Sequence, residues 1–301
     1  MFRYSGLVNR VTIIGAGRMG GALAIALSRA DYSIVNIVFR TTPQVGWPDL
    51  IVPKPMIQSI DDHDPLDTDI IVIATGDTEI RTAAASIVGR IVRDKAVVLH
   101  TSGALSSSEL VSLSNLGIRT GSIHPLISVS DPVRGADSFT GAYFCLEGDA
   151  EAVETARAIA ENLGGIPFSI ETRFKALYHA AAVLASGHVT TLFSSAAETL
   201  AHCGLAEDAA LRALLPLLKS TVRNLSEDAP ADALTGPFAR ADVEAIDRHL
   251  TAFEAAGLNV ERRIYTDLGQ IALRLSVRKG IDAGKAAEIQ NTLKLALATA
   301  K

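Results

Sequence analysis

The pattern of apolar residues changes near residue 170. Before that point, short apolar runs of strand length alternate with segments of helical periodicity, and beyond it the sequence is helical throughout. Alternating strands and helices are typical of a sheet covered by helices on both faces. The sequence therefore predicts an α/β domain with a doubly wound, mostly parallel sheet over residues 1–170, followed by an all-α domain over residues 171–301.

The predicted strands are apolar runs that end in polar or glycine residues. They span residues 11–14, 33–40, 57–60, 69–75, 96–100, 119–123, 143–146 and 166–170. A strand that is apolar on both faces, such as 69–75, is expected in the middle of a covered sheet. Helices are predicted after the first strand and over residues 78–93 and 150–163.

The second half begins with a predicted long helix over residues 171–203, which lacks proline and is followed by Gly204. A helix that is apolar nearly all round is expected to be buried, either within its domain or against another subunit. We therefore expect a homodimer formed through this half. Further helices are predicted over residues 211–225, 241–256, 259–278 and 283–299.

A glycine-rich turn follows the first strand. Gly15, Gly17 and Gly20 have the spacing of a dinucleotide-binding turn, with Arg18 and Met19 between them. The first glycine permits the turn, the second lets a pyrophosphate approach the backbone, and the third lets the helix pack closely against the strand. The N-terminus of the helix then faces the phosphates.

The end of the second strand indicates which dinucleotide binds. An acidic residue there binds the ribose 2′-hydroxyl of NAD, whereas an arginine favours the 2′-phosphate of NADP. Arg40 occupies this place and is followed by Thr41 and Thr42. The sequence therefore predicts NADP(H), and the alternative is that Arg40 is a solvated loop charge.

Polar residues also follow later strands. Ligands of such sheets gather at the carboxyl ends of the strands. We therefore expect the cofactor site to include Thr75, Asp77, Thr101, Ser102 and Gly103, and we assign His124, which comes after the strand 119–123, to the substrate.

One face of the predicted long helix carries Lys175, Tyr178, His179 and Ser186, given 100° per residue. A buried Lys and His on an apolar helix need a partner or a purpose. We expect Lys175 and His179 to donate a proton or an electrostatic pull to a carbonyl or imine, with Tyr178 and Ser186 near the substrate. Alternatively, Lys175 reaches solvent and His179 is a satisfied core histidine.

The turn that contains Thr235, Gly236 and Arg240 is a second predicted part of the substrate site. Asp242, which follows it, is equally well explained as the N-cap of the next helix.

Composition and charge narrow the possibilities. The net charge is -5 and no basic run occurs, which disfavours nucleic acid and anionic membranes as partners. The two cysteines and seven histidines have no metal-ligand spacing, so no metal is predicted. The start of the chain lacks the apolar core of a signal peptide, from which we expect a cytoplasmic protein.

Four motifs carry a resemblance to known proteins. They are HTSGA at 100–104, HPL at 124–126, KALYHAAA at 175–182, and LTGP at 234–237 with Arg240 and Asp242. The chain resembles the 6-phosphogluconate and β-hydroxyacid dehydrogenase superfamily, which includes pyrroline-5-carboxylate and ketopantoate reductases. It is more closely similar to Rossmann-like proteins with a C-terminal domain of unknown function.

The resemblance implies hydride transfer with a lysine of the helical domain near the substrate, and Lys175 stands at the matching position. Hydroxyacid dehydrogenases commonly carry an asparagine one turn later, where this chain has His179. The leading hypothesis is an NADP(H)-dependent oxidoreductase that reduces a C=O or C=N bond of a small polar metabolite. The alternatives are a non-catalytic NADP(H)-binding regulatory or sensor protein and a dimeric scaffold with a vestigial site.

Overall fold

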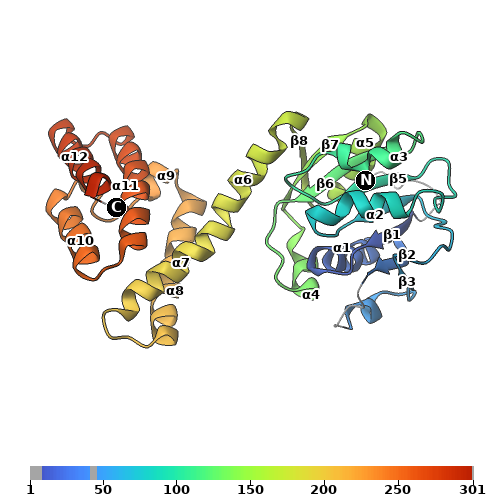
Figure 1. Ribbon diagram of the computed structural model, residues 1–301, viewed down its shortest axis with the longest axis horizontal. Helices are drawn as coiled ribbons and strands as arrows, with labels where there is room; N and C mark the ends of the chain where they lie inside the picture. The colour runs from blue at the N-terminus through green and yellow to red at the C-terminus, as the bar shows by residue number, and fades with distance from the viewer. Residues whose placement is uncertain (1–8, 41–45, 300–301) are drawn as a thin grey trace. The chain divides into compact units, whose positions relative to one another are not determined.

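The structure, a computed structural model, describes residues 9–40 and 46–299. The chain divides into two compact units, Met1–Ser186 and Gly187–Lys301 (Figure 1). This division lies later than the boundary expected at residue 170, because helix α6 (Lys175–Ala185) belongs to the first unit. Its first residue, Lys175, is only 2% exposed and donates a hydrogen bond to Ser122, which lies in the sheet of that unit.

The described part of the first unit holds one sheet of eight strands in the order β3-β2-β1-β4-β5-β6-β7-β8. Neighbouring strands are parallel except for β6 and β7, which are antiparallel. The bounds are β1 Arg10–Ile14, β2 Ser33–Phe39, β3 Met56–Ser59, β4 Ile70–Ile73, β5 Val97–His100, β6 Arg119–Pro125, β7 Tyr143–Gly148 and β8 Ile166–Ser169. The doubly wound, mostly parallel sheet is thereby confirmed, and β1 and β4 lie side by side where the chain reverses its direction across the sheet.

Helices cover both faces of the sheet. In β4, Ile70 and Val72 pack into one core together with residues of α1 (Arg18–Arg29) and α5 (Ala150–Asn162), whereas Ile71 and Ile73 pack into the other core. This alternation is the two-residue period of a strand. The second core includes residues of α2 (Ile80–Ser86) and α3 (Val111–Ser114).

The remaining short elements of the first unit connect the strands. They are α4 Pro132–Gly135 and the 3₁₀ turns η1 Trp47–Leu50, η2 Asp77–Glu79, η3 Ser107–Leu110, η4 Ala136–Ser138 and η5 Thr172–Phe174. Two predictions in this unit were wrong in detail. The helix expected over 78–93 ends at Ser86, and His124 lies within β6 rather than beyond its end, because pairing with β7 extends that strand to Pro125.

The second unit is helical, as predicted. Its helices are α7 Gly187–Ala201, α8 Glu207–Glu227, α9 Pro230–Ala233, α10 Val243–Ala255, α11 Asn259–Arg278 and α12 Ala283–Thr299. Its core gathers Ile246, Leu250, Leu273, Ile289 and Leu293. Pro216 lies inside α8, which is longer than the helix expected there.

The single helix expected over residues 171–203 was wrong. Ser186 departs from helical geometry (φ −127°, ψ −75°) and separates α6 from α7. Ser–Gly pairs are frequent places for such a break, and Gly187 follows directly. Of the two alternatives for the burial of this segment, the first is wrong, because Lys175 in α6 and Ala197 in α7 are the buried residues of these helices; burial against another subunit stays a prediction.

Thr172–Ala201 is long and apolar enough to cross a membrane by length and composition alone, with a mean hydropathy of 1.2, and 6% of the tested window is buried. Its apolar side chains are therefore exposed in the single chain. Leu177, Leu184 and Leu192 are examples.

Candidate functional site

The glycine turn between β1 and α1 has a different constraint at each glycine. Gly15 has a left-handed backbone (φ +104°), and a Cβ there would lie 2.7 Å from the carbonyl carbon of Ala74. A Cβ on Gly20 would lie 1.9 Å from the carbonyl oxygen of Gly15, so this position permits the helix to pack against the turn. A Cβ on Gly17 would meet nothing within 4 Å. Gly17 therefore faces open space at the N-terminus of α1.

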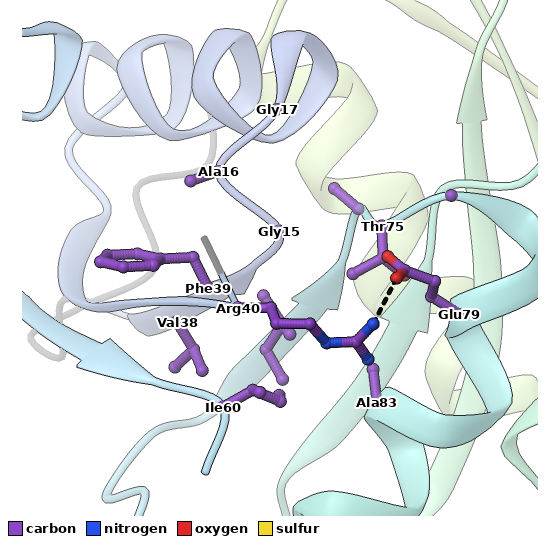
Figure 2. Close-up of a pocket in the computed structure, with 13 residues that line it drawn as sticks. Gly15, Ala16, Gly17, Val38, Phe39, Arg40, Ile60, Thr75, Glu79 and Ala83 are labelled. Atoms are coloured by element: carbon purple, nitrogen blue, oxygen red, sulfur yellow. Dashed lines mark hydrogen bonds and ion pairs between the residues drawn. The ribbon is translucent and has the colours of Figure 1, made fainter. Parts of the chain in front are cut away.

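A cavity of about 340 Å³ lies beside this turn (Figure 2). Its lining comes from the turn, from the ends of β2 and β4, and from η2 and α2, and includes Gly15, Gly17, Val38, Arg40, Ile60, Thr75, Glu79 and Ala83. The hydroxyl oxygen of Thr75 is buried and has no hydrogen-bond partner among the described residues. A buried hydroxyl without a partner is available to a ligand.

An ion pair spans part of the cavity lining. Arg40 follows β2, and its Nη1 lies 2.6 Å from Oε1 of Glu79 in η2 (Figure 2). The sequence analysis missed Glu79. Glu79 could have been found from its position, because it follows the buried strand β4 closely and therefore lies at the same edge of the sheet as Arg40. Thr41 and Thr42 lie outside the described residues.

The other predicted cofactor residues lie near this edge and differ in how far they are exposed to solvent. Arg18 is exposed in the first turn of α1, and Met19 packs against the core. Asp77 is exposed in η2, and Thr101 is half-buried directly after β5. Open space at Gly17, a helix N-terminus without a side-chain cap and the unpaired hydroxyl of Thr75 together fit a dinucleotide.

Lys175 is buried against the ends of β5 and β6. Its Nζ donates hydrogen bonds to the carbonyl oxygen of Ser102 and to Oγ of Ser122, each at 3.0 Å. The alternative that Lys175 reaches solvent is therefore contradicted. Burial lowers the pKa of Lys175 below its ordinary value, although nearby acidic groups favour the ammonium form. The third N–H of the ammonium has no partner among the described residues.

Two histidines stand beside the lysine. His124 Nδ1 lies 2.7 Å from the hydroxyl of Tyr178, and the rings of His124 and His179 meet edge to face at 5.6 Å. Burial and the charge of Lys175 lower the pKa of His124 to about 3, so its ring is neutral at pH 7. Burial raises the pKa of Tyr178, which keeps its hydroxyl protonated.

Gly103 makes room for this pair of histidines. A Cβ on Gly103 would lie 2.5 Å from Nδ1 of His179 and 2.8 Å from the ring of His124. Nδ1 of His179 is itself buried and has no partner among the described residues. His179 is therefore not the fully satisfied core histidine of the alternative interpretation.

A buried carboxylate, Glu147, is connected to Lys175 through the hydroxyl of Ser122. Glu147 accepts hydrogen bonds from the backbone N–H of Ser107 (2.9 Å), from the hydroxyl of Ser107 (2.8 Å), from Thr172 (3.1 Å) and from Ser122 (3.4 Å). Ser122 thus stands between the carboxylate and the ammonium of Lys175. The resulting cluster of Lys175, Ser122, Glu147, His124, Tyr178 and His179, which we call the lysine cluster, lies within the first unit.

His100 borders the lysine cluster. Its Nδ1 accepts a hydrogen bond from the backbone N–H of Ser102 at 3.2 Å. Burial lowers the pKa of His100 to about 4. The sequence analysis did not assign a role to His100, Ser122, Cys145 or Glu147. For three of them, the spacing of two residues along a strand is the pattern that could have found them. Ser122 and His124 face the same side of β6, and they pair with Glu147 and Cys145 of β7.

Some predicted substrate residues are not part of the lysine cluster. Ser186 is exposed at the end of α6. Thr235, Gly236 and Arg240 belong to the second unit, where Gly236 has a left-handed backbone (φ +84°). The carboxylate of Asp242 accepts a hydrogen bond from the backbone N–H of Ala245 at 3.0 Å, as the N-cap interpretation predicted. The described residues contain no group of three or more His, Cys, Asp or Glu that could hold a metal ion.

The sheet order, the glycine turn and the helical second unit define an α/β protein with a doubly wound sheet and an α-helical C-terminal part. Residues 6–125 match the model of the Rossmann-like domain, and residues 142–272 match a domain of unknown function, DUF2520. The chain therefore joins a Rossmann-like domain to a DUF2520 domain, which confirms the closer resemblance, to Rossmann-like proteins with a C-terminal domain of unknown function. No curated protein matches the sequence.

Solved structures share this fold along nearly their whole length. A protein of Bacteroides fragilis that is provisionally described as an NADP oxidoreductase is 24% identical with a TM-score of 0.69, covering 88% of this chain and 98% of its own. A protein of Thermotoga maritima is 22% identical with a TM-score of 0.68, covering 89% and 99%. Pyrroline carboxylate reductase of Plasmodium falciparum, solved with NADP bound, is 14% identical with a TM-score of 0.56, covering 89% and 98%. At these identities the likeness establishes the fold.

Proposed function

We propose that this protein is an NADP(H)-dependent oxidoreductase that reduces a C=O or C=N bond of a small polar metabolite. The observation that carries the proposal is the buried ammonium of Lys175, one N–H of which has no partner in the described part of the chain, in the same unit as a glycine-lined cavity that fits a dinucleotide. Burying a charged side chain costs free energy, and buried titratable groups of this kind are frequent at functional sites. The oxidoreductases among the structures of similar fold support the same assignment.

The cofactor would be held at the carboxyl edge of the sheet. The N-terminus of α1 and the open face of Gly17 would bind the pyrophosphate, and Arg40 would bind the 2′-phosphate. The hydroxyl of Thr75 would gain its missing partner there. When bound, the nicotinamide supplies the hydride, and the protein supplies the proton and the electrostatic stabilisation.

The lysine cluster supplies those two contributions. The carbonyl of Ser102 and the hydroxyl of Ser122 fix the direction of the Lys175 ammonium, whose third N–H can polarise a carbonyl or imine. The positive charge stabilises the negative charge that develops on a carbonyl oxygen during reduction. His179, with an unpaired Nδ1, and the Tyr178–His124 pair are positioned to deliver the proton.

The test is consumption of NADPH in the presence of a panel of ketones, 2-oxo acids and cyclic imines. We expect turnover with at least one class, a loss of about 100-fold or more in Lys175→Met, and a smaller loss in His179→Asn. The matched control is Lys279→Met, at an exposed lysine that pairs with Asp232 in the second unit. NADPH binding without turnover in any class contradicts the enzymatic proposal and favours a regulatory or sensor protein.

We also propose that a second copy of this chain covers the apolar side chains of the helical half, and that the enzyme acts in the cytoplasm. Leu192 and Leu217 are more than two-fifths exposed in the single chain, although such residues are typical of an interior. Lys175, at the start of the apolar segment, bonds to the sheet unit, which favours a protein rather than a lipid environment. Sedimentation is expected to give a dimer at micromolar concentration, and a monomer contradicts this.

A further inference from the structure

The ion pair between Arg40 and Glu79 is a feature that fold stability does not explain. The guanidinium of Arg40 and the carboxylate of Glu79 approach to 2.6 Å, although both side chains are about half exposed, at 56% and 44% (Figure 2). Exposed ion pairs of this kind contribute little to stability. Both residues line the cavity beside the glycine turn, so their charges would act on a ligand bound there.

The two side chains act in opposite directions on the ligand features that distinguish NADP from NAD. A 2′-phosphate carries nearly two negative charges, which the guanidinium of Arg40 attracts and the carboxylate of Glu79 repels. The carboxylate also competes with the phosphate for the same guanidinium nitrogen. A 2′-hydroxyl is neutral, and it can donate a hydrogen bond to a carboxylate. Glu79 therefore disfavours the phosphate and tolerates the hydroxyl.

We propose that Glu79 is a cofactor-specificity residue that moderates the preference set by Arg40, so that the site accepts NAD(H) as well as NADP(H). This inference rests on the proposed function, because it assumes that the cavity binds the adenosine end of a nicotinamide dinucleotide. Arg40 sets the direction of the preference and Glu79 limits its size. The pair comes from two separate segments, the residue after β2 and the turn after β4.

The experiment compares two fragments of the cofactors on the full chain by calorimetry. Adenosine 2′,5′-bisphosphate carries the 2′-phosphate, and 5′-AMP carries the 2′-hydroxyl. In Glu79→Gln, which keeps the shape and removes the charge, we expect the bisphosphate to bind about tenfold more tightly, whereas 5′-AMP changes by less than about twofold. Arg40→Gln is expected to weaken the bisphosphate selectively.

A double variant and a matched control separate a direct effect from a general one. In the Arg40→Gln background, Glu79→Gln should tighten bisphosphate binding less than in the wild type, because the competition for the guanidinium is gone. The control is Asp137→Asn, which breaks the exposed Arg29–Asp137 pair (2.7 Å) away from the cavity lining and should change neither affinity.

The possible outcomes distinguish this inference from the proposed function. Equal tightening of both ligands in Glu79→Gln, or no change in either, overturns the role of Glu79 and leaves the dinucleotide site intact. A wild-type chain that binds neither fragment, and neither NADPH nor NADH, overturns the proposed function itself.

Discussion

The glycine-lined cavity and the lysine cluster are two polar sites of the same unit that are built in different ways. The cavity is formed by backbone, by open space at Gly17 and by an exposed ion pair. The lysine cluster is formed mainly by buried side chains that hydrogen-bond to one another, with Glu147 and Lys175 on either side of Ser122. Gly17, Arg40 and Glu79 of the cavity can therefore change without disturbing the fold, whereas the cluster is part of the packing.

The comparison can be tested through the free energy of unfolding. Changes at Glu147 and at the buried histidines of the cluster are expected to alter this free energy strongly, whereas changes in the cavity are expected to alter ligand binding with little effect on stability.

The largest expected effect is a loss of stability in acid that originates in the buried histidines. The pKa of His100 is lowered to about 4 and that of His124 to about 3 in the folded protein, against about 6.5 for an unfolded chain. Below pH 6.5 the unfolded state binds more protons than the folded state, so stability is fully present above pH 6.5 and is lost as the pH falls toward 4. Two such groups give a slope of roughly 2.7 kcal/mol per pH unit near pH 5.

The measurement is denaturant unfolding of the wild type and of His124→Asn between pH 7.5 and 4.5. Because other groups titrate in the same range, the difference between the two proteins is the informative quantity. We expect the slope to be smaller in the variant by about half of the histidine contribution. Identical slopes in the two proteins contradict the burial of a neutral His124.

The next largest effect is expected for Glu147→Ala. This change removes the acceptor of four hydrogen bonds and leaves Ser107, Ser122 and Thr172 without it. We expect a loss of about 3–5 kcal/mol in the free energy of unfolding, measured with urea at pH 7. Glu151→Ala, which removes an exposed carboxylate that pairs with Arg119, is the control and should lose less than about 1 kcal/mol. A loss in Glu147→Ala as small as that in the control would contradict the structural role of Glu147.

The same contrast explains what the sequence could predict. The glycine turn is a contiguous motif whose spacing fixes its backbone geometry, so the roles expected for Gly15, Gly17 and Gly20 could be formulated from eleven residues of sequence. The close approaches at Gly15 and Gly20 are the expected ones, and the contact of Gly17 with a pyrophosphate stays a prediction. The sheet was predicted for the same reason, because each strand is a local apolar run and alternating elements leave few arrangements.

The lysine cluster was predicted only in part, because its members are distant in sequence. Helical periodicity placed Lys175, Tyr178 and His179 on one face, but the partners Ser122 and Glu147 come from an antiparallel pair of strands. Pairing register is not contained in either strand alone. The break at Ser186 was missed because composition favours a continuous helix, and one residue with non-helical dihedrals is enough to divide it.

A smaller effect on stability is expected for Lys175→Met. The change removes two hydrogen bonds, which costs stability, and it also removes the desolvation penalty of a buried charge, which offsets that cost, so we expect a net change within about 1 kcal/mol at pH 7. Since burial lowers the pKa of Lys175, the unfolded state binds more protons between that pKa and about 10.4, and wild-type stability rises with pH in this window. This rise should be absent in the variant.

Urea unfolding from pH 7 to 10.5 and NADPH turnover on the same preparations test this expectation. Retained stability together with lost turnover identifies Lys175 as a functional group. A loss of more than about 3 kcal/mol with unchanged turnover would instead make Lys175 a structural residue of the cluster, as Glu147 is.

The smallest effect on stability is expected for Gly17→Ala, in the cavity. A Cβ at this position meets no atom within 4 Å, and its φ of −76° suits any residue, so the helix N-cap should lose less than about 1 kcal/mol. The added methyl group occupies the space through which a pyrophosphate would approach the backbone, and NADPH affinity should fall at least about tenfold. Calorimetry and thermal unfolding of one preparation test both halves. Unchanged NADPH affinity would mean that the open space at Gly17 does not face the dinucleotide, in which case the glycine spacing would reflect only the packing of α1 against β1.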